Sequence, residues 1–170
     1  MEFSPEGPMA IPLWINGHTF LTVTESFFDV TDAATGAPVR RVPLCGATQA
    51  EQAVLAARGA QPDWAEMGLP ARRVCLSRLA DALERYSGHF AKLLMQETGC
   101  NEAHANAEVG AAVTALRGVS VGETGVFALV VDASRPLSGF AEVMAPALMA
   151  GATMVRSEER RVGKECRSRW

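Results

Sequence analysis

A single stretch, residues 126–155, constrains the fold more than any other part of the sequence. Residues 126–131 form a continuous apolar run of strand length, residues 136–150 form an apolar helix pattern that Gly151 ends, and residues 152–155 begin a second strand. An unbroken apolar run is typical of a strand that is covered on both faces. Strand, helix and strand in this order predict a parallel pair, so we assign the chain to the α/β class.

The start of the chain is predicted to be β-rich. The dipeptide Asn16-Gly17 separates residues 13–15 from residues 18–21, and it favours the tight primed turn of a β-hairpin. A second turn at residues 32–36 leads into a short strand near residues 39–44.

The middle of the chain is predicted to be helical. Thr48 and Glu51 have the spacing of a capping box, which indicates a helix from there to about Ala60. Pro70 fits the first turn of the next helix. In that helix we expect one face to be buried, formed by Val74, Leu76, Leu79, Ala80 and Leu83, and the other to point outward, with Arg72, Arg73, Arg78 and Glu84.

Two further helices are expected before the parallel unit. Residues 89–98 continue as helix and end at Gly99, which readily takes the left-handed conformation. Asn101 is predicted to cap a helix that runs to about Arg117, with Gly118 closing it.

Cysteine use and charge limit the function classes. The four cysteines lie far apart, without a C-x-x-C pair or a histidine at ligand spacing, so we expect free thiols, no metal site and a cytoplasmic protein. Residues 156–170 hold six Lys and Arg against three acids, which leaves ten basic and sixteen acidic residues in 1–155. The acidic body argues against nucleic acid as a partner. The most apolar stretch, residues 140–155, is interrupted and shorter than the roughly 20 residues that a membrane span needs.

Several short sequence motifs, in this order along the chain, carry a resemblance to a known family. They are Trp-Ile-Asn-Gly at 14–17, Asp-x-x-Thr-Gly at 32–36, Glu-Thr-Gly at 97–99 and Ala-Pro-Ala-Leu-x-Ala-Gly at 145–151. Together they make residues 11–155 similar to the aldehyde dehydrogenase superfamily. The resemblance implies a fold in which an N-terminal β-hairpin and helices lead into the start of a Rossmann-like parallel sheet, here truncated to a partial NAD(P)-binding domain.

The resemblance also implies a chemistry. A cysteine thiolate attacks a small aldehyde, hydride passes to NAD or NADP, and a glutamate helps water to release the acid. Both the nucleophilic cysteine and this glutamate are expected downstream of Val155, so neither is in this chain. The parent enzyme would form a homo-oligomer, although residues 118–125 are short for the family, which usually inserts there a β-hairpin that joins its oligomerisation domain.

One catalytic element of the family is expected here, in the loop after residues 126–131. Alignment on Pro136 puts Ser134 at the family's oxyanion-binding asparagine, Ala133 at its tryptophan and Asp132 at its first proline. We therefore name Ser134 as the candidate catalytic residue and Val131, Asp132 and Ala133 as candidate cofactor contacts. A serine hydroxyl donates one hydrogen bond but reaches less far than an amide. The alternative is that Ser134 and Asp132 only form a polar loop that caps the following helix.

The last fifteen residues differ from the rest. Residues 156–170 read RSEERRVGKECRSRW and resemble the translation of a common sequencing-library adapter, so we treat them as a non-native tail. The family's cofactor lysine would fall at Ser157, inside this tail. The alternative is a basic arm that binds phosphate. We accordingly divide the chain into a flexible leader (1–10), the partial NAD(P)-binding domain (11–155) and the tail (156–170).

Two other functions stay open. The helices between Thr48 and Arg117 are also compatible with a non-catalytic interaction protein, and Asp132-Ala133-Ser134 is compatible with a pseudoenzyme of the same fold. We expect the 170-residue chain to be inactive by itself, because a parallel sheet of about two strands leaves an unpaired edge.

Overall fold

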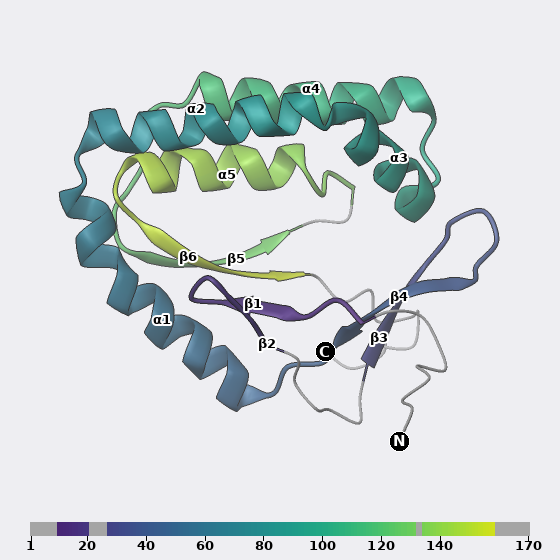
Figure 1. Cartoon of the computed structure of the whole chain (residues 1–170), viewed down its shortest axis with the longest axis horizontal. Helices are drawn as coiled ribbons and strands as arrows, with labels where there is room; N and C mark the ends of the chain where they lie inside the picture. The colour runs from purple at the N-terminus through teal and green to yellow at the C-terminus, as the bar shows by residue number, and fades with distance from the viewer. Residues whose placement is uncertain (1–9, 21–26, 132–133, 159–170) are drawn as a thin grey trace, which may run out of the picture.

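The computed structural model describes residues 10–20, 27–131 and 134–158 of the chain (Figure 1). Two antiparallel hairpins come first and a helical region follows, before a parallel strand pair. In chain order the elements are β1 (Leu13–Ile15), β2 (His18–Phe20), β3 (Phe27–Thr31), β4 (Pro38–Pro43), α1 (Ala47–Glu66), α2 (Leu69–Arg85), α3 (Ser87–Thr98), α4 (Glu102–Arg117), β5 (Val126–Val131), α5 (Ser138–Met149) and β6 (Thr153–Glu158).

The parallel unit that the sequence predicts is present, and the α/β class is confirmed. β5 and β6 pair in parallel from Val126 opposite Thr153 to Val131 opposite Glu158, and α5 connects them. β6 therefore continues past Val155 into the first residues of the segment 156–170. The guanidinium of Arg156 lies 5.0 Å from the centre of the Phe140 ring on α5, a cation–π distance.

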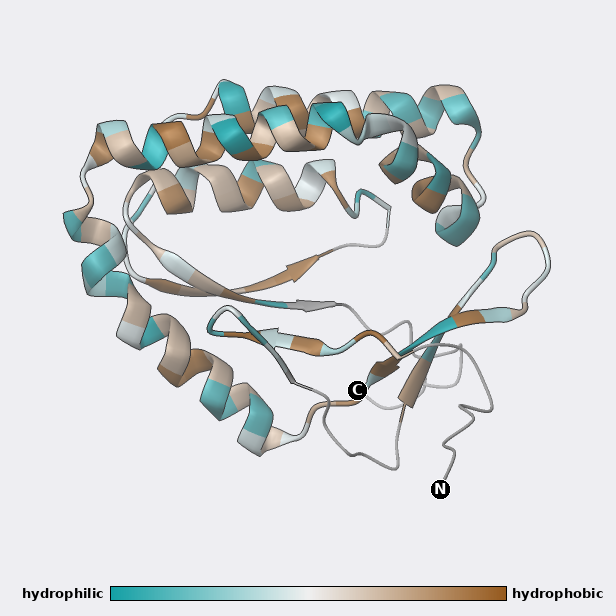
Figure 2. Cartoon of the chain, viewed as in Figure 1, coloured by the Kyte–Doolittle hydropathy of each residue, from teal (hydrophilic) through white to brown (hydrophobic). Residues whose placement is uncertain are grey.

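The expectation that β5 is covered on both faces is wrong for the described chain. Val130 is 62% exposed and its neighbour Val131 is 8% exposed, because successive side chains of a strand point to opposite faces. Figure 2 shows β5 as largely hydrophobic along its length. One apolar face of this strand is thus packed and the other is open.

The core lies between three helices. α5 is placed between the β5–β6 pair and an outer layer that α2 and α4 form (Figure 1). Small and branched apolar side chains interdigitate there. The most buried of them are Leu76 and Ala80 of α2, Val109, Ala112 and Leu116 of α4, and Ala141, Ala145 and Met149 of α5.

The predicted faces of α2 are partly wrong. Leu76, Ala80 and Leu83 are buried as expected, but Val74 and Leu79 are 49% and 44% exposed. Arg72, predicted to point outward, is only 7% exposed. Its Nε donates to the Met149 carbonyl over 3.0 Å, and its Nη1 donates to the Ala65 carbonyl over 2.7 Å. Hydrophobic spacing cannot reveal an arginine whose place is fixed by distant carbonyl groups.

α1 begins and ends differently from the prediction. Its N-terminal cap is Gly46, whose amide donates to Gln49 Oε1 over 3.0 Å, instead of the Thr48–Glu51 pair. The helix also continues through Pro62 to Glu66 and does not end near Ala60.

Side-chain contacts hold the second half of α1 to the parallel unit. Trp64 Nε1 donates to the Leu148 carbonyl over 2.9 Å, and Gln61 Nε2 donates to the Gly151 carbonyl over 3.1 Å. One turn earlier on α1, the Ala57 carbonyl accepts from Thr153 Oγ1 over 2.7 Å. Gly151 has φ +87, and a Cβ there would lie 3.0 Å from the Ala65 Cα, so only glycine fits this close approach.

The expected hairpin turn, the end of α3 and the start of α4 are confirmed. Asn16 and Gly17 both have positive φ, 52 and 74, as a primed turn requires. Gly99 ends α3 in the left-handed region, and Asn101 Oδ1 accepts from the His104 amide over 2.8 Å at the start of α4. Residues 118–125 contain no strand.

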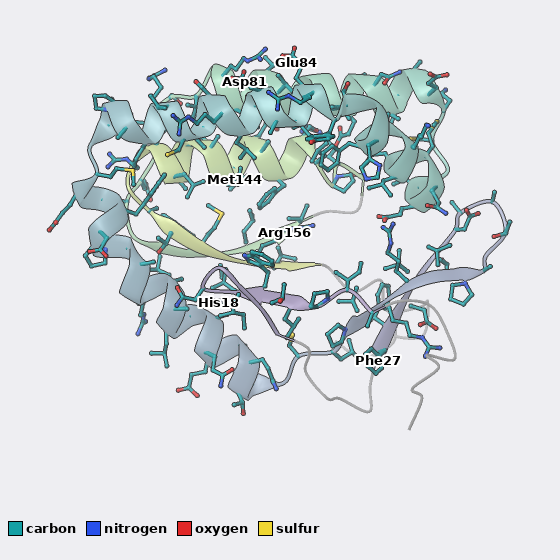
Figure 3. All side chains as sticks on the ribbon, in the orientation of Figure 1. His18, Phe27, Asp81, Glu84, Met144 and Arg156 are labelled. Carbon is teal, nitrogen blue, oxygen red and sulfur yellow. The ribbon has the colours of Figure 1, made fainter. Side chains whose placement is uncertain are left out.

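An ion-pair cluster lies on the outer side of the helical layer. Arg117 Nη2 of α4 is 2.9 Å from Asp81 Oδ1 and 2.6 Å from Glu84 Oε2, both on α2 (Figure 3). All three side chains are exposed, so the cluster adds little to stability.

Candidate active-site loop

The loop after β5 lies where ligands bind in open parallel sheets, at the carboxyl end of a strand. Val131 ends β5 with a buried side chain, and Ser134 follows in the loop with an exposed one. Asp132 and Ala133 lie outside the described residues. α5 begins at Ser138, two residues later than the expected start at Pro136.

Glu108 is a buried acid that hydrogen-bonds to the chain just after this loop. Its side chain comes from α4 and is 8% exposed. Oε1 accepts from the backbone amides of Leu137 and Ser138 over 3.2 and 2.9 Å, and Oε2 accepts from Ser138 Oγ over 2.7 Å. A carboxylate at a helix N-terminus satisfies amides that otherwise lack partners and interacts favourably with the helix dipole.

These contacts set the charge state of Glu108. Burial by itself would raise its pKa, but the hydrogen bonds from Ser138 and Leu137 and the positive charge of Arg135 outweigh burial, and the pKa is lowered. Glu108 is therefore a carboxylate near neutral pH.

Arg135 also contacts the first turns of α5. Its guanidinium donates to Glu142 on α5, and its carbonyl accepts from the Gly139 amide over 3.1 Å. The hydrogen bond and charge of Glu142 raise the pKa of Arg135. Both side chains are about half exposed.

Sequence reasoning missed Glu108, although a signal for it exists. It lies three residues after Ala105 and four before Ala112, on the buried face of α4. A lone acid on an apolar helix face implies a polar partner from another element, because a buried charge without one is costly. The sequence did not indicate which element supplies that partner.

The first turn of α5 does not fit the phosphates of a dinucleotide. In many nucleotide-binding folds this turn donates its free amides to phosphate. Here the amides of Leu137 and Ser138 already donate to Glu108, and the carboxylate would repel a second anion. A dinucleotide would need other residues to hold its phosphates.

The remaining candidates for chemistry are few among the described residues. Cys45, Cys75 and Cys100 are free thiols, and burial raises the pKa of Cys45, opposite to the shift that activates a nucleophilic cysteine. In the described ranges, no three His, Cys, Asp or Glu side chains are grouped to hold a metal ion. No helix of these ranges is long and apolar enough to cross a membrane.

Comparison with known proteins identifies the family. The sequence profile of the aldehyde dehydrogenase family matches residues 20–121. The chain belongs to the aldehyde dehydrogenase family. The match covers β3 to α4 and ends at Val121, before β5 and the Ser134 loop.

Curated members of the family are similar over a comparable length of the chain. N-succinylglutamate 5-semialdehyde dehydrogenase of Chromohalobacter salexigens is 35% identical over 100 residues, which cover 59% of this chain and 19% of that protein. Vanillin dehydrogenase of a Pseudomonas species is 38% identical over 80 residues, which cover 47% of this chain and 17% of that protein. The chain thus spans about a fifth of the length of these relatives.

Solved structures match a larger share of the chain than the family profile does. Lactaldehyde dehydrogenase from Escherichia coli has a TM-score of 0.82 at 23% identity, covering 88% of this chain and 36% of that one, which shows a shared fold. PnpE, solved with nicotinamide adenine dinucleotide, has a TM-score of 0.80 at 26% identity, covering 86% of this chain and 35% of its own. The aldehyde dehydrogenase fold therefore accounts for most of the chain.

Proposed function

We propose that this chain forms the first part of the cofactor domain of an NAD(P)-dependent enzyme that oxidises an aldehyde to a carboxylic acid. The observation that carries the proposal is the family match over residues 20–121, followed directly by the parallel unit β5–α5–β6. Because the chain spans about a fifth of its curated relatives, the complete activity belongs to a longer protein that includes this segment.

In this proposal Ser134 is a hydrogen-bond donor to the oxyanion that develops when a thiolate attacks the aldehyde carbon. Its place after β5 and its exposed side chain leave it accessible to a ligand. None of the cysteines of this chain matches the family's nucleophile motif, so we assign the nucleophilic cysteine and the glutamate to the part of the relatives' length that this chain does not span.

We also propose that Val131, Asp132 and Ala133 border the cofactor. The Val131 side chain is buried, so contact there would involve the end of the strand and not that side chain. NAD or NADP would accept the hydride, and the NAD complex of PnpE supports this class of cofactor. Since the α5 turn does not fit phosphate, we derive no step through the cofactor from the residues of this chain.

The partners follow from the same proposal. The substrate is a small aldehyde, and the relatives act on a semialdehyde, vanillin or lactaldehyde according to their names. We propose a homo-oligomer in the cytoplasm, without nucleic acid or membrane partners. The absence of a strand in residues 118–125 predicts that its subunit contacts differ from those of relatives with a hairpin there.

The segment 156–170 needs a separate proposal. We propose that it is translated adapter sequence and that native residues differ from Arg156 onward. Pairing of β6 through Glu158 is compatible with this, because backbone hydrogen bonds of a parallel pair do not depend on side-chain identity. Resequencing of the source DNA across the Val155 codon tests it. A genomic reading frame that encodes RSEERR would overturn it.

The function is tested on the longer enzyme recovered from that DNA. Absorbance of NADH or NADPH at increasing concentrations of vanillin, lactaldehyde and a succinylated semialdehyde measures turnover, and the 170-residue chain is the matched control without activity. Cofactor binding without turnover on a broad aldehyde panel would favour the pseudoenzyme. A longer protein without nucleotide affinity would favour the non-catalytic interaction protein.

A further inference from the structure

The stretch of chain that leaves the Ser134 loop is fixed by a residue from a distant helix. Glu108 of α4 accepts hydrogen bonds from Leu137 and Ser138, three and four residues after Ser134. Ser138 is fully buried, and Glu108 is 8% exposed. Water therefore competes little with these three bonds, and they determine where the chain enters α5.

The carboxylate is well matched to this task. Its two oxygens accept from two backbone amides and one hydroxyl, so both the position and the direction of the first turn of α5 are specified. Bonds to a charged acceptor are shorter and stronger than those between neutral groups. The exposed Arg135–Glu142 pair acts on the same stretch, but solvent screening makes it the weaker restraint.

We propose that Glu108 is a positioning residue, which fixes the place of Ser134, after the carboxyl end of β5, by holding Leu137 and Ser138. The inference rests on the proposed function for its catalytic consequence, although not for its structural part. Glu108 does not touch the substrate in this proposal. It acts on the oxyanion donor through Leu137 and Ser138.

The alternative is that Glu108 only caps α5. If Glu108 is only a cap, its removal lowers the stability of the helix and leaves the surroundings of Ser134 unchanged. A positioning residue changes the surroundings of Ser134 as well. The two roles are therefore separated by a readout at Ser134, in addition to one at the cap.

The first experiment uses the 170-residue chain and needs no activity. Backbone amide NMR shifts are compared between the wild type, Glu108→Gln, and the control Glu84→Gln, which weakens only the surface ion-pair cluster between α2 and α4. We expect Glu108→Gln to shift the amides of Ser134 and Arg135 together with those of Leu137 and Ser138, and Glu84→Gln to shift none of them. Shifts confined to Leu137 and Ser138 would overturn the proposal.

A second variant covers the case in which Glu108→Gln does not fold. Glu108→Asp keeps the charge and withdraws the carboxylate by one methylene, and the same Ser134 amide reports the result. An unmoved Ser134 amide in a folded Glu108→Asp chain would equally overturn the proposal.

The second experiment is a double-mutant cycle in the longer enzyme. We expect Glu108→Gln to reduce kcat about tenfold or more with little change in the KM for aldehyde, and Glu108→Gln with Ser134→Ala to lose no more than Ser134→Ala alone. Independent losses that multiply would overturn the proposal. If the wild-type enzyme shows no turnover, the proposed function fails, whereas the NMR result still decides the role of Glu108.

Discussion

Arg72 and Met149 are 77 positions apart in the sequence, and Arg72 Nε donates to the Met149 carbonyl over 3.0 Å. The same guanidinium donates to the carbonyls of Trp64 and Ala65 at the end of α1. One buried side chain therefore satisfies the carboxyl ends of two helices, α1 and α5, whose last carbonyls lack partners within their own helices.

Replacement of Arg72 should destabilise the chain strongly. Arg72→Met keeps much of the side-chain volume but leaves buried carbonyls without donors, and we expect a loss of about 2–4 kcal/mol in the free energy of unfolding. Urea unfolding followed by circular dichroism measures it. Arg73→Met, at an exposed position of the same helix, is the matched control and should change stability by less than about 0.5 kcal/mol. Equal effects of the two variants would contradict this account of Arg72.

Glu108 should make stability depend on acid pH. Its pKa is lower in the folded chain than in the unfolded chain, where a glutamate titrates at about 4.3. Its contribution is therefore present above that pH and is lost as the pH falls below it toward the folded-state pKa. Unfolding free energies measured from pH 6 to pH 2.5 should fall less steeply in Glu108→Gln than in the wild type. An unchanged slope in Glu108→Gln would contradict this assignment.

Replacement of two glycines by alanine should change the stability of the chain in opposite directions. Gly151→Ala forces an L-residue to φ +87 and brings its Cβ to 3.0 Å from the Ala65 Cα, so we expect a loss of about 1–3 kcal/mol. Gly110 lies inside α4 with open space around it, and Gly110→Ala should gain about 0.5–1 kcal/mol from helix propensity. Thermal unfolding of both variants tests the pair, and a stabilised Gly151→Ala would show that α1 and α5 do not approach closely there.

Ser134 should affect the rate in the longer enzyme more than it affects stability. Loss of one oxyanion donor typically lowers kcat by about 10²–10³-fold, so Ser134→Ala should fall in or near that range. Ser134→Asn, which restores the longer amide donor, should keep or raise kcat. Ser120→Ala, at an exposed position away from the loop, serves as the control. An unchanged kcat in Ser134→Ala would favour the alternative, in which Ser134 only belongs to a polar loop that caps α5.

Local signals in the sequence predicted local structure well. The primed turn at Asn16-Gly17, the left-handed end at Gly99 and the cap at Asn101 each depend on residues within one turn of the chain, and all three are present. The apolar runs on either side of α5 likewise indicated a parallel pair. These features need no knowledge of distant partners.

The errors arose where a distant group determines the outcome. Arg72 is buried because carbonyls of α1 and α5 accept its protons, and helical periodicity alone makes it a surface residue. α1 continues through Pro62 while Gln61 and Trp64 are held by the end of α5. Glu108 was overlooked for the same reason, since its partners are about 30 positions away. Ser134 was placed at the candidate site by resemblance, and its role there stays a prediction.

The contacts of α1 also bear on how such a chain is synthesised. Ala57, Gln61 and Trp64 meet partners 96, 90 and 84 positions further along. A ribosome must therefore release β5, α5 and the start of β6 before this helix can dock, and until then its inner face stays exposed on the nascent polypeptide. Long separations of this kind slow folding through loop-closure entropy.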